Sequence, residues 1–145
     1  MISRILLATD FSPSSRRAER TALDLAKAMG ASVVVLHAIE PIDPDGDQAP
    51  FQGFYASLGR KAEDLMKEIT GRFVGAGARC DGRITVARRW RAILDAAEAE
   101  GADLIVLGGR QQFGAGHVDM GTTSHKVFLA SAVPLLVARE GEELR

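Results

Sequence analysis

The chain has 145 residues, enough for one domain that buries a sizeable core without disulfides or metals. Its composition, 46% hydrophobic and 26% charged with 18 basic against 19 acidic residues, excludes intrinsic disorder and argues against nucleic-acid binding. No apolar run approaches the roughly 20 residues that cross a bilayer, and the single cysteine, Cys80, fits a reducing compartment, so we expect a cytoplasmic protein with no membrane role.

The first forty residues predict a strand, a helix and a second strand. Residues 2–9 (ISRILLAT) hold a short apolar run that stops at Asp10, which indicates a buried strand with a polar residue at its carboxyl end. The sequence Ser-Pro-Ser-Ser that follows suits the start of a helix over about Pro13–Met29, which Gly30 ends. Residues Ser32–Ile39 (SVVVLHAI) are rich in β-branched side chains and predict the next strand.

The middle of the chain predicts a long connection, then a helix, a strand and a helix. Residues Glu40–Ser57 contain three of the five prolines and two glycines, so we expect a loop that is either a solvated excursion or a cover over a site. Apolar residues then repeat at helical spacing over about Leu58–Val74. The alternating stretch Cys80–Val86 suits a strand at a sheet edge, and the alanine-rich segment Trp90–Glu100 predicts another helix.

Three arginines between this strand and this helix form the tightest basic cluster of the chain. Arg88, Arg89 and Arg91 surround Trp90. We interpret them as a solvated rim of a loop, which is the usual meaning of such a short charged run. Cys80, in the preceding strand, has no accompanying His and Asp pattern, so we interpret it as a packing residue or a surface thiol rather than a nucleophile.

The last third of the chain combines strand ends, glycines and hydroxyls. Residues Leu104–Leu107 are entirely apolar and predict a buried strand that stops at Gly108 and Gly109. A polar, glycine-rich loop follows, and a helix is expected over about Thr123–Ser131. After Pro134, residues 135–138 (LLVA) predict a final short strand. The domain thus spans residues 1–139, and residues 140–145 form a charged tail.

These elements predict an α/β fold with a five-stranded, mostly parallel sheet flanked by helices. In such sheets ligands bind at the carboxyl ends of the strands, where the winding direction reverses, and the first and fourth strands are the natural pair to flank that point. We therefore expect Asp10 and Gly108 to be neighbours.

The segment after the fourth strand has the features of a phosphate site. Gly121 allows close approach of a ligand, and the hydroxyls of Thr122 and Thr123 are natural N-cap groups for the helix that follows. Unpaired N–H groups and the positive end of a helix dipole would then point at one spot. The alternative is a glycine-rich connection that binds nothing, as many α/β domains have.

Two strand ends carry further candidates for ligand contacts. Asp10 could bind a ribose hydroxyl or a magnesium ion held mainly by phosphates, or it could cap the following helix. His37 lies within an apolar strand and is expected to be a satisfied residue of the core or crevice, while Ala38 and Ile39 could offer backbone groups to a flat base.

Other chemistries are not supported by the residues. His117 and His125 lie eight residues apart with no cysteine or fixed acidic partner, so we expect no zinc site. No Ser-His-Asp or paired-carboxylate arrangement suggests a catalyst. A phosphoacceptor receiver domain would need an acidic pair after the first strand and a lysine after the last, whereas Asp10 stands alone and Arg139 follows the last strand.

Four segments together carry a resemblance to a known family. In order they are ILLATDFSPSS, VVVLHAIE, EGADLIVLGGR and GTTSHKVFLASAVPLLVAR. With these segments the chain resembles the universal stress protein family from Ile2 to about Arg139. The resemblance implies a Rossmann-like sandwich of the adenine nucleotide alpha hydrolase type. It also implies a homodimer in which the last strand, Leu135, Leu136 and Val137, pairs with its copy, which would cover an exposed apolar edge.

The nucleotide-binding branch of that family has a glycine signature that this chain matches in part. Gly108 supplies the first glycine and Gly121 with Thr122 supplies the last pair, but Gln111 stands at the position of the middle glycine. If ATP binds with magnesium, the resemblance puts Thr9 and Asp10 near the ribose and phosphates and Ala38 against adenine. The triphosphate would lie against residues of the fourth strand end and the following helix: Gly108, Gly121, Thr122 and Thr123. Gln111 could donate its amide to a phosphate or could fill the space.

The function expected from these observations is that of a cytoplasmic, dimeric stress-response module whose state depends on ATP or another adenine nucleotide. We expect it not to be primarily an enzyme. Two alternatives stay open: a nucleotide-independent family member that acts through an unknown protein partner, for which Gln111 is the main argument, and a slow nucleotide-phosphate hydrolase that acts by positioning alone.

Overall fold

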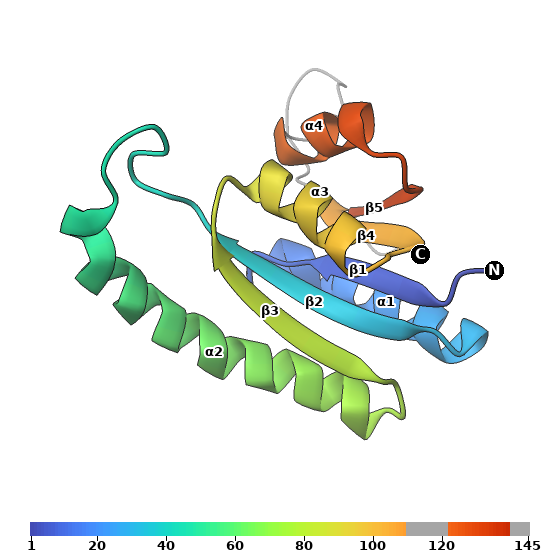
Figure 1. The fold of residues 1–145 in the computed structure, drawn as a ribbon. Helices are drawn as coiled ribbons and strands as arrows, with labels where there is room; N and C mark the ends of the chain where they lie inside the picture. The colour runs from blue at the N-terminus through green and yellow to red at the C-terminus, as the bar shows by residue number, and fades with distance from the viewer. Residues whose placement is uncertain (110–121, 140–145) are drawn as a thin grey trace, which may run out of the picture.

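A computed structural model of the chain describes residues 1–109 and 122–139 and contains one five-stranded sheet (Figure 1). The strands lie in the order β3-β2-β1-β4-β5, and every neighbouring pair is parallel. The winding direction reverses between the first and fourth strands, as expected, and the third strand lies at an edge. The strands are β1 (Arg4–Ala8), β2 (Ser32–Ile39), β3 (Cys80–Val86), β4 (Leu104–Gly109) and β5 (Leu135–Arg139).

In the part of the chain that the structure describes, four α-helices cover the two faces of this sheet. Figure 1 shows α1 and α2 on one face and α3 and α4 on the other. Two single-turn 3-10 helices, η1 and η2, precede the first two. The bounds are η1 (Pro13–Ser15), α1 (Arg16–Met29), η2 (Ala49–Phe51), α2 (Gln52–Gly75), α3 (Arg89–Ala99) and α4 (Thr122–Ala130). The fold class predicted from the sequence is therefore confirmed.

The central strands form two cores because successive side chains point to opposite faces of the sheet. On β1, Ile5 and Leu7 pack with the helices α1 and α2, where Phe73 is fully buried. Leu6, between them, packs on the other face with α3 and α4, where Ile93 and Val127 are buried. Burial on both faces explains why the strands read as continuous apolar runs in the sequence.

The connection expected over residues 40–57 is shorter than predicted. The helix α2 begins at Gln52 rather than near Leu58, directly after η2. Pro50 lies in the first turn of η2, where a missing N–H costs nothing, so it starts the helix instead of interrupting the chain. Tyr55, which lies within the connection expected from the sequence, is buried, and its hydroxyl accepts a hydrogen bond from the N–H of Ile42 at 2.9 Å. Within the described residues, no helix is long and apolar enough to cross a membrane.

Candidate functional site

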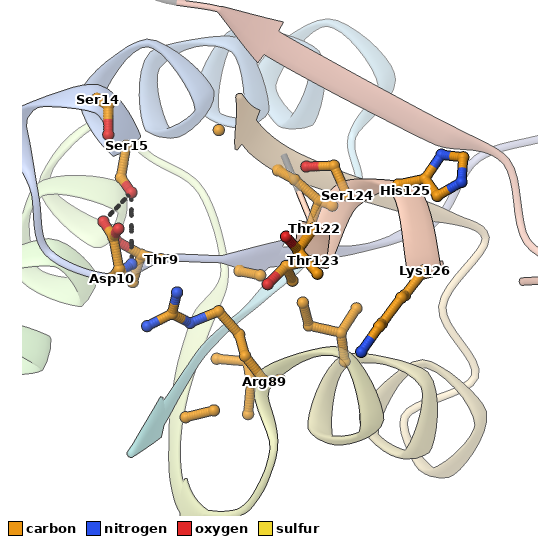
Figure 2. Close-up of a pocket in the computed structure, with 16 residues that line it drawn as sticks. Thr9, Asp10, Ser14, Ser15, Arg89, Thr122, Thr123, Ser124, His125 and Lys126 are labelled. Carbon is orange, nitrogen blue, oxygen red and sulfur yellow. Dashed lines mark hydrogen bonds between the residues drawn. The ribbon is translucent and has the colours of Figure 1, made fainter. Parts of the chain in front are cut away.

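A pocket opens at the carboxyl edge of the sheet, between β1 and β4 (Figure 2). Its volume is about 630 Å³, which lies within the usual range for small-molecule sites. Residues from the ends of β1, β2 and β4, from η1 and from the starts of α3 and α4 line it. The polar ones are Thr9, Asp10, Ser14, Ser15, Arg89, Thr122, Thr123, Ser124, His125 and Lys126. The expected meeting of Asp10 and Gly108 at one crevice is therefore found.

One oxygen of the Asp10 carboxylate organises the loop between β1 and η1. Oδ1 accepts hydrogen bonds from the N–H of Ser12 at 2.9 Å, from the hydroxyl of Ser15 at 2.6 Å, and from the hydroxyl of Ser12. The bond from Ser15 is drawn in Figure 2. Within the described residues Oδ2 has no hydrogen-bond partner. The carboxylate thus serves the loop through one oxygen and leaves the other for a ligand.

The pKa of Asp10 is lowered despite its partial burial. Burial alone would raise it, but the hydrogen bonds from Ser12 and Ser15 and the nearby positive charge of Arg89 outweigh that effect. Asp10 is therefore a carboxylate throughout the neutral range and presents a fixed negative charge to the pocket.

The end of β1 is held from the neighbouring strand by His37. Its Nδ1 donates to the carbonyl oxygen of Thr9 at 2.9 Å, and its ring lies 4.2 Å from that of Phe11, centroid to centroid. Phe11 has a φ of 63°, an uncommon conformation for a residue with a side chain. The Thr9 hydroxyl accepts a bond from the N–H of Phe11 at 3.0 Å, which stabilises this sharp turn. The interpretation of His37 as a satisfied residue is confirmed.

Gly108 lines the pocket and also allows close packing behind it. A Cβ atom added at this position would lie 3.0 Å from the carbonyl oxygen of Ser14 and 3.3 Å from the Cα of Ser15. The backbone of η1 therefore rests against the end of β4 at the place where Gly108 lacks a side chain. This packing is sufficient reason for a glycine here, independent of any ligand.

The start of α4 forms the wall of the pocket opposite Asp10. Thr122 and Thr123 are the first two residues of the helix, so the expectation that they occupy the N-cap position is wrong, although both line the pocket. As first-turn residues they have backbone N–H groups without partners in the helix, which is the feature that favours an anion. Ser124, next in sequence, is buried.

Sequence reasoning missed Arg89 as a pocket residue. Arg88 and Arg91 do form exposed ion pairs, with Asp45 at 3.2 Å and Asp95 at 3.6 Å, as a solvated rim would. Arg89, however, lines the pocket, so its interpretation as part of that rim is wrong. The sequence feature that could have identified it is its position in the first turn of the helix that follows a strand. In a parallel sheet all connections from a strand to the next helix leave from the same edge, where ligands bind.

The remaining predicted positions divide into three groups. Ala38, at the end of β2, lines the pocket as expected, together with Thr9. Gln111 and Gly121, with His117, lie outside the described residues.

Cys80 is a free, half-buried thiol whose pKa burial raises to about 12, so at neutral pH it is not a nucleophile. Among residues 1–109 and 122–139, no group of three or more His, Cys, Asp and Glu side chains could hold a metal ion.

Comparison with known proteins agrees with this architecture. The chain is 38% identical, over 96% of its own length and 100% of the relative's, to a universal stress protein from Thermus aquaticus. A hypothetical protein solved as a structural-genomics test case superposes with a TM-score of 0.85 at 23% identity over 99% of each chain. The universal stress protein of Archaeoglobus fulgidus in complex with dAMP gives a TM-score of 0.68 at 21% identity over 95% of this chain and 99% of that one. Residues 1–139 match the universal stress protein family, and the chain therefore belongs to that family.

Proposed function

We propose that this universal stress protein binds an adenine nucleotide in the pocket between β1 and β4 and acts as a binding module whose state depends on that ligand. The observation that carries the proposal is the meeting of Asp10, Ala38 and the first turn of α4 around one cavity of nucleotide size. The complex of the Archaeoglobus fulgidus relative with dAMP supports the same ligand class.

Each wall offers a group that suits one part of a nucleotide. Oδ2 of Asp10, which has no partner within the described residues, can accept a hydrogen bond from a ribose hydroxyl. The N–H groups and hydroxyls of Thr122 and Thr123 can donate to phosphate oxygens. Leu36 and Ala38 supply apolar surface and strand-end backbone for the base.

As an alternative to the ribose hydroxyl, the Asp10 carboxylate suits a magnesium ion that arrives with the nucleotide. Magnesium sites in nucleotide-binding proteins commonly use one or two carboxylates and take their other ligands from phosphates and water. Asp10 provides one carboxylate at the pocket, so the ion would be held mainly by the phosphates of its own nucleotide.

Calorimetric titration with ATP and magnesium tests the proposal. The wild type and Gln111→Gly are compared, because Gln111 stands where the family signature has a glycine. Binding by the wild type supports the proposal directly. Binding by Gln111→Gly alone identifies the glutamine as a block and makes this chain a nucleotide-independent member. If neither protein binds ATP or AMP, the proposal fails.

The role proposed is binding rather than catalysis, because the described pocket residues include a single carboxylate, Asp10, whose Oδ1 already accepts hydrogen bonds from Ser12 and Ser15. Measuring phosphate release by purified protein tests this part. Turnover that is abolished by Asp10→Asn would make the protein a nucleotide hydrolase; binding with negligible turnover agrees with a sensor.

The proposal includes a cytoplasmic homodimer joined through β5. Leu135, Leu136 and Val137 are only partly buried at this edge of the sheet, and Phe128 and Leu129 of α4 are 60% and 69% exposed. An apolar strand edge and exposed apolar side chains on the helix that precedes it are both surfaces that association would cover.

A further inference from the structure

Arg89 is a cation that faces the pocket and, within the described residues, forms no ion pair. Within the described part of the chain, no carboxylate oxygen lies within 4.0 Å of its guanidinium, whereas its neighbours Arg88 and Arg91 are both paired. Figure 2 shows the side chain extending from α3 toward Asp10. The other long cation of the pocket, Lys126, is held elsewhere, with its Nζ 5.6 Å from the centre of the Trp90 ring.

The backbone of Arg89 is fixed on the β2 side of the pocket. Its N–H donates to Oε1 of Glu40 at 3.0 Å, and the N–H of Ala87 donates to the carbonyl oxygen of Ile39 at 3.0 Å. The start of α3 is thereby attached to the chain that leaves β2. A guanidinium mounted on a fixed backbone loses less freedom when it binds an anion than one on a free loop.

Arg89 and the first turn of α4 approach the cavity from different sides. Arg89 stands beside the end of β2, and Gly108, at the end of β4, lies on the other side of β1. Because neighbouring strands lie about 4.8 Å apart, these two strand ends are separated by about 10 Å. Thr122 and Thr123 lie away from Asp10 in Figure 2. The pocket therefore has two electropositive places, one on each side of the reversal point.

From this arrangement we infer that the pocket selects a nucleotide with two separate anionic groups: a 5′ phosphate at the start of α4 and a second phosphate on the ribose 2′ or 3′ oxygen, bound by Arg89. This inference rests on the proposed function and names the ligand class of the same site. The planar guanidinium donates two parallel hydrogen bonds to a phosphate, a geometry that an ammonium group lacks. Arginine has this role toward the ribose 2′-phosphate in dinucleotide-binding proteins.

The position beside Asp10 gives this contact its selectivity. An unphosphorylated ribose leaves the guanidinium without an anion and leaves Asp10 to accept its hydroxyls. A ribose phosphate brings two negative charges to the same place, which only a cation there can offset. Without Arg89 the carboxylate of Asp10 would repel that phosphate, so the preference must invert or vanish when the arginine is removed.

The test compares AMP with adenosine 3′,5′-bisphosphate and adenosine 2′,5′-bisphosphate by calorimetric titration of the full chain. The variants are Arg89→Ala, Arg89→Lys and the control Arg88→Ala, which removes an exposed arginine that pairs with Asp45 and does not line the pocket. We expect one of the bisphosphates to bind the wild type at least about tenfold more tightly than AMP. The ratio should fall to about one or below in Arg89→Ala, be reduced in Arg89→Lys, and be unchanged in Arg88→Ala.

Three results would overturn the inference, and they are distinguishable. Equal affinity of the wild type for AMP and both bisphosphates removes the selectivity but leaves the proposed nucleotide site intact. A preference that survives in Arg89→Ala assigns the second phosphate to another group. Failure of the wild type to bind any of the three nucleotides removes the proposed function and the inference together.

Discussion

The imidazole of His37 donates a hydrogen bond from Nδ1 to the carbonyl oxygen of Thr9, at 2.9 Å, and thereby fixes the peptide between Thr9 and Asp10, just after β1, from the neighbouring strand. Asp10 follows this peptide directly, so the position of the pocket carboxylate depends on a histidine that does not line the pocket itself. Because a carbonyl oxygen only accepts, Nδ1 carries the proton, and the neutral ring satisfies the contact.

The free energy of unfolding should decrease as the pH falls below 6.5, because His37 takes up a proton more readily in the unfolded chain than in the folded one. Burial is the largest effect and lowers the pKa of His37 below the ordinary 6.5, and the positive charge of Arg89 acts in the same direction. The Thr9 carbonyl and the negative charge of Asp10 raise the pKa, but not enough to offset the lowering. Below pH 6.5 the unfolded chain therefore binds a proton that the folded chain resists, so the stabilisation present above pH 6.5 is lost as the pH falls toward the folded-state pKa. Urea unfolding of wild type and His37→Gln across this window measures it; equal pH slopes would contradict the assignment.

Removing the Asp10 side chain should destabilise the fold more than removing only its charge. Asp10→Ala leaves the N–H of Ser12 and the hydroxyl of Ser15 without their acceptor, at a cost of about 1–3 kcal/mol in free energy of unfolding. Asp10→Asn keeps an oxygen at Oδ1 and should lose much less. Urea unfolding measures both, with Asp24→Ala on the exposed face of α1 as the control. Equal losses for the alanine and asparagine variants would show that the charge, not the acceptor, holds the loop.

The packing of η1 on β4 predicts a cost for any side chain at Gly108. In Gly108→Ala the new methyl would meet the Ser14 carbonyl at 3.0 Å, and moving η1 away should cost about 1–3 kcal/mol. Gly71→Ala is the matched control, because a Cβ there meets nothing within 4 Å on the exposed face of α2, and it should stabilise by up to about 1 kcal/mol. Thermal unfolding of the two variants should show shifts of opposite sign; a neutral Gly108→Ala would mean that η1 is free to move.

The proposed dimer should be weakened by charge on the exposed face of α4. We expect the wild type to have twice the 15.5 kDa mass of the chain by light scattering. Phe128→Glu combined with Leu129→Glu should shift it toward the monomer, because two glutamates would enter an apolar interface. Val74→Glu, at an equally exposed apolar residue near the end of α2, is the control and should leave the mass unchanged. A monomeric wild type would remove the dimer from the proposal.

The strands and the reversal point could be predicted from the sequence because their physical signals are local. Buried parallel strands are continuous apolar runs, and the run ending at Asp10 and the one ending at Gly108 were both recognisable as such. The start of α2 could not be recognised in this way, because Pro50 is typical both of a loop and of a first helical turn. Only the burial of Tyr55 decides between these two structures.

The pocket was predictable in part for the same reason. Asp10 and Ala38 lie at ends of strands that the sequence identified, and their meeting follows from strand order. The contact of Arg89 with the pocket does not follow from a short run of arginines. The position of its backbone depends on the hydrogen bond from its N–H to Glu40, a residue far earlier in the chain. A local charge pattern identifies a cluster of arginines. Tertiary contacts decide which arginine of the cluster faces the cavity.

The central claim, that an adenine nucleotide occupies the cleft between β1 and β4, is tested most directly by amide chemical shifts of isotope-labelled protein during titration with ATP and magnesium. We predict that the amides that shift cluster at the carboxyl edge, at Thr9, Asp10, Ala38, Gly108, Thr122 and Thr123. Amides at the opposite edge, such as those of Ser32 and Asp103, should stay in place. Shifts confined to that opposite edge, or none at saturating nucleotide, would contradict the account.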